Sequence, residues 1–168
     1  RLFGEGQADV LYGGFNNDTL DGGAGNDLLF GGGQSDQLFG GLNNDTLDGG
    51  EGGDTYVIDT EVTADIIAES GTSGIDSILL TGTDQFDFDT LDLSRIERIT
   101  GRDEVNEHLD ANGMDHAVDI FAMDGDDTVI ASTHGGVIDA GAGNDLIMGG
   151  DVDPAEMAAF IAFHSDGA

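Results

Sequence analysis

A nine-residue pattern of apolar and polar positions runs without interruption from residue 4 to residue 57. In each of its six units the eighth position is a large apolar residue, and the sixth position is Asp. The apolar positions are Leu11, Leu20, Leu29, Leu38, Leu47 and Tyr56, and the acidic positions are Asp9, Asp18, Asp27, Asp36, Asp45 and Asp54. Strand periodicity predicts that the last three positions of a unit are extended, with one inward apolar side chain. The first five positions are rich in Gly and Asn, which enter positive φ at little cost, and they predict a turn.

Two units predict one flattened coil of eighteen residues, so that units n and n+2 stack on the same side. Stacked parallel strands lie about 4.8 Å apart, which sets the spacing of the Asp side chains along the stack. Two carboxylates at that distance repel by about 1 kcal/mol in water, and by more where water is scarce. A hard divalent cation between coils reverses this repulsion, and Ca²⁺ accepts about 6–8 carboxylate and carbonyl oxygens. A disordered Gly/Asp-rich linker does not explain apolar residues in strict phase, so we expect disorder only without calcium.

The unit G-G-x-G-x-D-x-U-x, in which U is a large apolar residue, resembles the nonapeptide of RTX (repeats-in-toxin) proteins. This resemblance implies an all-β fold, a right-handed parallel β-roll or β-solenoid, with each Ca²⁺ held between units n and n+2. It implies four complete sites, formed by the pairs Asp9/Asp27, Asp18/Asp36, Asp27/Asp45 and Asp36/Asp54. It also implies carbonyl ligands from turn positions 1 to 4, namely Gly13, Phe15, Gly22, Gly23, Ala24, Gly25, Gly31, Gly32, Gly33, Gln34, Gly41, Asn43, Gly50 and Gly52. At the fourth position Asn tolerates positive φ better than the Gln of units 1 and 4.

The nine-residue pattern returns over residues 122–150. Asp127 and Asp145 are eighteen residues apart, so we expect them to stack on one side and to share one further ion. Gly136 stands where the intervening unit should have Asp, and we expect that unit to bind no ion.

Residues 58–121 predict an irregular β-rich extension, in which wider coils continue the same stack. Short apolar runs over residues 56–58, 66–67 and 75–80 predict strands. Asp65, Glu69 and Asp76 are open to two interpretations, further ligands or a solvated turn, and we prefer the turn. Residues 84–100 alternate apolar and polar side chains and predict more strand, with a short helical turn near Ser94.

Most of the few basic residues lie in this extension. Arg95, Arg98 and Arg102 are predicted to pair locally with Glu97 or with the Asp columns, and a patch that recognises an acidic polysaccharide is the alternative. His108 and His116 are interpreted as surface-loop residues rather than as ligands of a transition metal.

Residues 151–168 predict a short C-terminal helix. Asp153, Pro154 and Glu156 have the arrangement of a capping box with Pro at the first helical position, and an apolar face follows over residues 157–164. We expect the helix to cover the open end of the solenoid. A role in a type I secretion signal is compatible with that position.

Composition narrows the function classes. The chain has 35 acidic residues against 4 Arg and no Lys, which gives a net charge of −31 and disfavours nucleic acid and anionic membranes as partners. The sequence has no Cys, so no disulfide holds the fold. It also has no run of about 18 apolar residues that would predict a membrane-spanning helix. No H-E-x-x-H, G-x-S-x-G or Cys nucleophile is present, which indicates a protein without catalytic activity.

Together these patterns predict a first repeat array over residues 1–57, an extension over 58–121, a second array over 122–150 and a C-terminal tail over 151–168. We expect the chain to be the end of a larger protein, secreted by a Gram-negative bacterium through a type I apparatus. Its expected function is calcium-dependent folding outside the cell, because the acidic chain would stay unfolded in cytosolic calcium. The alternative is a surface- or polysaccharide-binding module of an adhesin or a polysaccharide-modifying enzyme.

Overall fold

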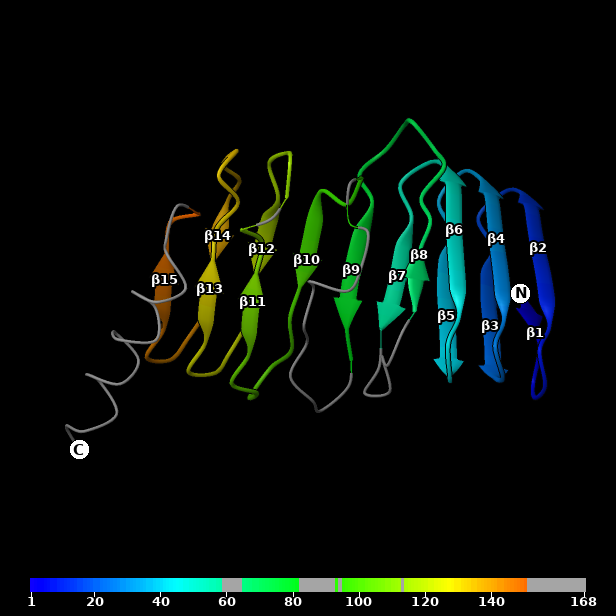
Figure 1. The fold of residues 1–168 in the computed structure, drawn as a ribbon, viewed down its shortest axis with the longest axis horizontal. Helices are drawn as coiled ribbons and strands as arrows, with labels where there is room; N and C mark the ends of the chain where they lie inside the picture. Colours follow the sequence, from blue (N-terminus) through cyan, green and yellow to red (C-terminus); the bar gives the residue numbers. More distant parts are fainter. Residues whose placement is uncertain (59–64, 82–92, 94, 113, 151–168) are drawn as a thin grey trace.

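The computed structural model describes residues 1–58, 65–81, 93, 95–112 and 114–150. Within these ranges every regular element is a strand, and no helix there is long and apolar enough to cross a membrane. The strands follow one another in chain order along one elongated stack (Figure 1). They are β1 (Leu2–Phe3), β2 (Val10–Phe15), β3 (Thr19–Ala24), β4 (Leu28–Gly33), β5 (Gln37–Leu42), β6 (Thr46–Glu51), β7 (Thr55–Ile58), β8 (Ile66–Ile67), β9 (Ser77–Leu80), β10 (Arg98–Thr100), β11 (His108–Asp110), β12 (Asp119–Phe121), β13 (Thr128–Ile130), β14 (Ile138–Asp139) and β15 (Leu146–Met148).

The strands form parallel sheets in which each strand pairs with the strand one coil later. One sheet has the order β1-β3-β5-β7-β9-β10-β12-β14, and two shorter sheets have the orders β2-β4-β6-β8 and β11-β13-β15. In the first array, Leu11 is paired with Leu29 and Leu20 with Leu38, which is a shift of eighteen residues. The predicted coil of two nonapeptides is therefore confirmed, and so is the all-β solenoid.

The coils widen after the first array. Leu47 pairs with Ile67, twenty residues later, and Tyr56 pairs with Ile78, twenty-two residues later. The shift returns to eighteen residues where Ile120 pairs with Ile138. The extension therefore continues the same stack in wider coils, as predicted, and strands β7, β8 and β9 fall on the three predicted apolar runs.

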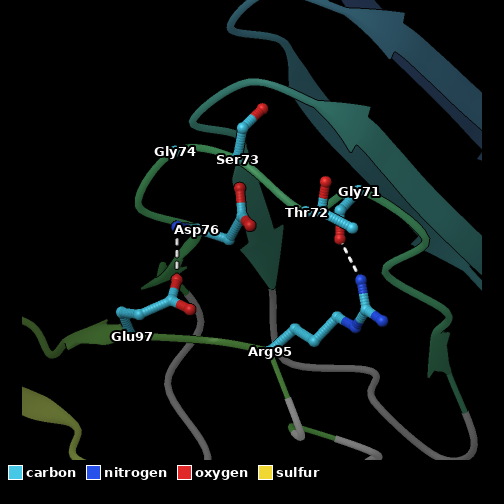
Figure 2. Close-up of a pocket in the computed structure, with 7 residues that line it drawn as sticks. All are labelled: Gly71, Thr72, Ser73, Gly74, Asp76, Arg95 and Glu97. Carbon is cyan, nitrogen blue, oxygen red and sulfur yellow. Dashed lines mark hydrogen bonds between the residues drawn. The ribbon is translucent and has the colours of Figure 1, made fainter.

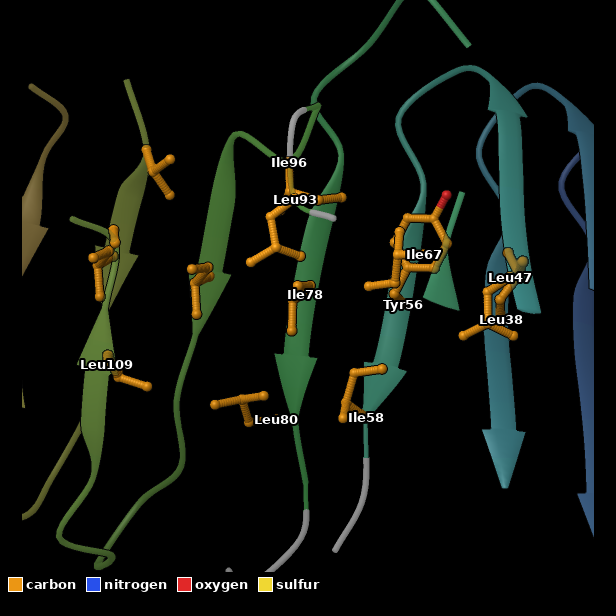
Figure 3. Packing of buried hydrophobic residues seen from close by; sticks show 14 of the residues in the cluster. Leu38, Leu47, Tyr56, Ile58, Ile67, Ile78, Leu80, Leu93, Ile96 and Leu109 are labelled. Atoms are coloured by element: carbon orange, nitrogen blue, oxygen red, sulfur yellow. The ribbon is translucent and has the colours of Figure 1, made fainter. Parts of the chain in front are cut away.

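The core is a row of apolar side chains that point inward from the sheets (Figure 3). Most strands bury an inward residue, because side chains alternate between the two faces of a strand, whereas β1, β14 and β15 at the ends of the sheets bury none. Leu20, Leu29, Leu38 and Leu47 have no exposed surface, and neither does Tyr56. The row continues beyond the first array through Ile67, Ile78, Ile99, Leu109, Ile120 and Val129.

The predicted division of each unit into turn and strand is only partly right. Strands β2 to β6 are six residues long, because they continue through the first three positions of the next unit. The glycine pairs stay in register, as Gly14 with Gly32 and Gly23 with Gly41. The turn is thus confined to positions 4 to 6.

Two predictions lie outside the described residues. These are the C-terminal helix over residues 151–168 and the strand pattern over residues 84–92. The predicted turn near Ser94 is described in part, since the Ile96 amide donates a 3.1 Å hydrogen bond to the Leu93 carbonyl oxygen.

Candidate metal sites

The repeated Asp residues form columns in which each carboxylate contacts the coil before it. One carboxylate oxygen, Oδ1, accepts a hydrogen bond from the backbone amide of the Asp one coil earlier. These bonds join the Asp9 amide to Asp27 at 2.8 Å, Asp18 to Asp36 at 2.7 Å, Asp27 to Asp45 at 2.8 Å and Asp36 to Asp54 at 2.7 Å. The stacking of units n and n+2 therefore brings together the pairs that the sequence predicted.

The second oxygen of several of these carboxylates is buried without a hydrogen-bond partner. Among the described residues, these atoms include Oδ2 of Asp9, Asp27, Asp36, Asp54 and Asp127, and Oε2 of Glu107. Burying an ionised carboxylate oxygen without a partner is costly, so such groups are normally paired or coordinate a metal ion. The columns thus present the oxygen ligands that Ca²⁺ prefers.

Glycine at the first position of each unit makes room for that oxygen. A Cβ on Gly22 would lie 2.5 Å from the Asp27 Oδ2 and 2.6 Å from the carbonyl oxygen of Gly40. A Cβ on Gly40 would likewise lie 2.6 Å from the Asp45 Oδ2. Carboxylate and carbonyl oxygens therefore gather at the same point between two coils, which explains Gly at this position.

The residues predicted to supply carbonyl ligands occupy positions 1 to 4 of their units. Gly13, Phe15, Gly22, Gly23, Ala24, Gly31, Gly32, Gly33, Gly41 and Gly50 lie in the strands at positions 1 to 3, and Gly25, Gln34, Asn43 and Gly52 lie in the turns. At position 4, Gln34 has φ 74° and Asn43 has φ 81°. Gln therefore adopts the same left-handed conformation as Asn, although it is less suited to it.

Burial changes the acidity of the columns. It raises the pKa of Asp36 and Asp127, and it raises the pKa of Asp54 to about 6. The hydrogen bond from the neighbouring amide lowers these pKa values, but burial outweighs it. Without a cation, the fold thus holds these carboxylates in surroundings that disfavour their charge.

The columns continue beyond the nonapeptides, and the solvated-turn interpretation of Asp65 and Asp76 is wrong. Both residues are 5% exposed. Asp65 Oδ1 accepts from the Asp45 amide at 2.9 Å, and Asp76 Oδ1 accepts from the Asp54 amide at 2.8 Å. Glu97 Oε2 then accepts from the Asp76 amide at 2.8 Å (Figure 2). Each of these acids therefore occupies the place of a repeat Asp in a wider coil.

Glu69 lies close to two acids of this column, Asp54 and Asp76. One carboxylate oxygen from each of Asp54, Glu69 and Asp76 lies within 4.8 Å of the other two. At that separation each pair repels by about 1 kcal/mol in water, and by about 3 kcal/mol at an effective dielectric constant of about 20. Burial and this repulsion together raise the pKa of Asp76 to about 7.

Near the end of the extension an Arg lies beside the acidic column that continues into the second array. Glu107 takes the place of a repeat Asp in this column. Its amide donates a 2.8 Å hydrogen bond to the Oδ1 of Asp127, one coil later. The Asp127 amide in turn donates to the Asp145 Oδ1 at 3.1 Å, so the predicted pair is brought together. Arg102 Nε donates to the Glu107 Oε1 at 2.8 Å, and the two side chains are 9% and 2% exposed.

The partners of the basic side chains differ from those predicted. Arg102 pairs with Glu107, a member of the acidic column that was not predicted. Arg95 donates to the carbonyl oxygen of Gly71 (Figure 2) and to that of Ser70. The Arg98 guanidinium lies 5.5 Å from the centroid of the Phe121 ring.

The surface-loop interpretation of His108 is also wrong, since this residue lies in strand β11. His116 bonds to the Ile96 carbonyl oxygen and the Asp115 carboxylate.

A fixed two-residue spacing between an acid and a buried apolar residue could have identified the acids that the sequence prediction missed. Each lies two positions before a buried apolar residue, as Asp does in the nonapeptide. The pairs are Asp65/Ile67, Asp76/Ile78, Glu97/Ile99 and Glu107/Leu109. The change of coil length from 18 to as many as 22 residues hides this signal from a search at fixed spacing.

Comparison with known proteins agrees with this geometry. The family model of the RTX calcium-binding nonapeptide repeat matches the chain in four copies, over residues 1–29, 21–56 and 121–153. A search of curated proteins finds no match. The repeats of this family bind Ca²⁺, and several repeats imply several ions. With more than half of its residues covered by the model, the chain belongs to the family of RTX calcium-binding nonapeptide repeats.

Proposed function

We propose that this chain is a calcium-dependent folding module of a secreted bacterial protein. In low calcium it stays unfolded and can be exported, and extracellular calcium then folds it. The observation that supports this proposal most is the set of buried carboxylate oxygens without hydrogen-bond partners along the solenoid axis. In a chain with net charge −31, folding brings the carboxylates of these columns together, and their repulsion opposes folding until cations neutralise them.

The proposed ligands follow from the stacking. Four sites use the pairs Asp9/Asp27, Asp18/Asp36, Asp27/Asp45 and Asp36/Asp54, together with the carbonyl oxygens of the turns above and below. A fifth site uses Asp127 and Asp145 in the second array. Because an ion that binds only the folded state stabilises it, calcium binding and folding become one event.

The proposal extends to the origin of the protein. RTX repeats occur in secreted proteins of Gram-negative bacteria. We therefore infer an extracellular location after export by a type I apparatus. The absence of Cys from the sequence fits such a route, because the metal ions take the stabilising role that disulfides have in other secreted domains.

Far-UV circular dichroism tests this proposal directly. The chain is measured in EGTA and across a calcium titration, with magnesium as the control cation. We expect a disordered spectrum in EGTA and a steep, calcium-selective gain of β signal. A full β signal in EGTA that calcium does not change would overturn the proposal.

The second candidate function is binding to a surface or a polysaccharide. The observation that favours it is an exposed apolar patch on the outer face of β2 and β4, where Val10, Tyr12 and Leu28 are 54%, 66% and 40% exposed. Tyr12 stacks on Phe30 with ring centroids 4.9 Å apart. Exposed patches of this kind often mark interaction sites. Affinity electrophoresis in an alginate gel with calcium tests it, by comparing the wild type with Tyr12→Ser and with an Arg95/Arg98→Ala variant, which keeps the buried Arg102–Glu107 ion pair.

A further inference from the structure

We propose that Asp54, Glu69 and Asp76 form an additional Ca²⁺ site, placed where the last nonapeptide of the first array meets the first wider coil. This inference rests on the proposed function, because it assumes that calcium fills the solenoid. It adds a site whose ligands Glu69 and Asp76 lie outside the nonapeptides.

The distances suit one shared cation. One oxygen from each of the three carboxylates lies within 4.8 Å of the other two. Ca²⁺ binds oxygen at about 2.3–2.6 Å, so two ligands of one ion lie up to about 5 Å apart. The three side chains can therefore share one calcium ion without a movement of the coils.

Asp54 supplies an oxygen that lacks a protein partner. The residue is 1% exposed, and its Oδ2 is buried without a hydrogen bond. Its Oδ1 accepts from the Asp36 amide at 2.7 Å, and its own amide donates to the Asp76 Oδ1 at 2.8 Å. Asp54 is thus fixed from both sides, so its Oδ2 cannot turn outward to water without breaking these contacts.

Glu69 is held in place by a hydrogen-bond relay from the coil before it. The Gly49 amide donates to the Tyr56 hydroxyl oxygen at 2.7 Å, and that hydroxyl donates to the Glu69 Oε2. The Glu69 Oε1 accepts from the Gly71 amide. A carboxylate that is oriented by surrounding donors is typical of a metal ligand with supporting second contacts.

The additional site differs chemically from the sites within the array. A nonapeptide pair offers two carboxylates, whereas this site offers three, because Glu69 stands two residues after the buried Ile67, where the array has the position 1 glycine. A Cβ on Gly71 would collide with the Gly50 carbonyl oxygen and lie 2.8 Å from the Glu69 Oε1, so a backbone carbonyl lies near this carboxylate. The wider coil, which shifts the pairing from eighteen to twenty residues, provides the space for a Glu here.

Terbium luminescence can detect this site, because Tb³⁺ replaces Ca²⁺ and emits when a nearby tyrosine is excited. The sequence has two Tyr and no Trp, and the hydroxyl of Tyr56 contacts the proposed ligand Glu69. The full chain is folded with Tb³⁺, with Tyr12→Phe as background so that Tyr56 is the only donor. Bound calcium is counted in parallel by elemental analysis after desalting.

The ligand variants are Glu69→Gln and Asp76→Asn, and the matched control is Glu5→Gln, which changes an exposed glutamate. We expect each ligand variant to fold with calcium, to hold one ion fewer than the wild type and to lose a large share of the Tyr56-sensitised emission. The control should keep both values. If either variant fails to fold, the other decides the result.

Two outcomes separate this inference from the proposed function. A wild-type ion count and wild-type emission in both variants would overturn the additional site while leaving calcium-dependent folding intact. A wild-type chain whose circular dichroism does not respond to calcium would instead overturn the proposed function, and with it the basis of this inference.

Discussion

Replacing Arg102 by Met removes the cation that lies beside the acidic column of Glu107, Asp127 and Asp145. The Arg102 Nε and Glu107 Oε1 atoms are 2.8 Å apart, and the side chains are 9% and 2% exposed. Breaking a buried ion pair by deleting one partner costs about 3–5 kcal/mol, because the other charge is left buried without compensation. In a domain of this length each kcal/mol shifts the melting temperature by about 2–4 °C, so Arg102→Met should lower it by about 6–20 °C.

The assay is thermal unfolding in saturating calcium, followed by circular dichroism. Arg1→Met serves as control, since Arg1 is exposed and lies over the Phe3 ring, and it should shift the melting temperature by less than about 4 °C. Adding Glu107→Gln to Arg102→Met should restore most of the loss, because a neutral amide replaces the uncompensated charge. A fall of less than about 2 °C for Arg102→Met would refute the reasoning, since this is the size expected of a solvent-exposed ion pair.

Three further predictions follow from the columns and the core. Gly31→Ala should raise the calcium concentration at the folding midpoint, because its Cβ would meet the Asp36 Oδ2 and lie 2.7 Å from the Gly49 carbonyl oxygen. The control Gly149→Ala, which has open space around its Cβ, should leave that midpoint unchanged, and calcium titrations of both variants measure it. Leu38→Ala should lower the free energy of unfolding in calcium by about 2–5 kcal/mol, measured by urea unfolding, since Leu38 has no exposed surface and its loss leaves a cavity. In EGTA, residual β signal should be larger at pH 5 than at pH 8. Because the folded-state pKa values of Asp54 and Asp76 are raised to about 6 and about 7, their contribution to stability is full below the ordinary carboxyl pKa and is lost as the pH rises through 6–7; equal signal at both pH values would contradict this.

The parts of the fold that could be predicted are those fixed by a strict period. Leu and Asp in one phase determine which face of each strand is buried and which coils stack, and the pairing of Leu11 with Leu29 confirms that reasoning. Position 1 glycine could be predicted as a turn residue, but its place in a strand beside a carboxylate could not. That role depends on the oxygen of Asp27 and the carbonyl of Gly40, which approach Gly22 only in the folded stack.

The acids of the extension were misjudged because their spacing along the chain varies. Asp76 follows Asp54 by twenty-two residues instead of eighteen, yet both occupy the same place in their coils. Parallel pairing depends on which residues are opposite one another and not on how many residues the connecting loops contain. Glu107 was missed for the same reason, and its pairing with Arg102 could not be anticipated from Arg102 alone, since Glu97 lies equally close in the sequence.

The bonds of the acidic columns all have the same direction, and this gives the solenoid two unlike ends. Among the described residues, each bond between a column amide and a column carboxylate runs to the carboxylate of the following coil, as from Asp9 to Asp27 and from Asp36 to Asp54. A coil that joins the N-terminal end therefore finds a carboxylate already in position, whereas a coil that joins the C-terminal end must bring its own. The two ends of the solenoid are therefore chemically different, like the two ends of a polar filament. Removing a coil from the C-terminal side leaves an amide without its acceptor, and removing one from the N-terminal side leaves a charged oxygen that water can reach.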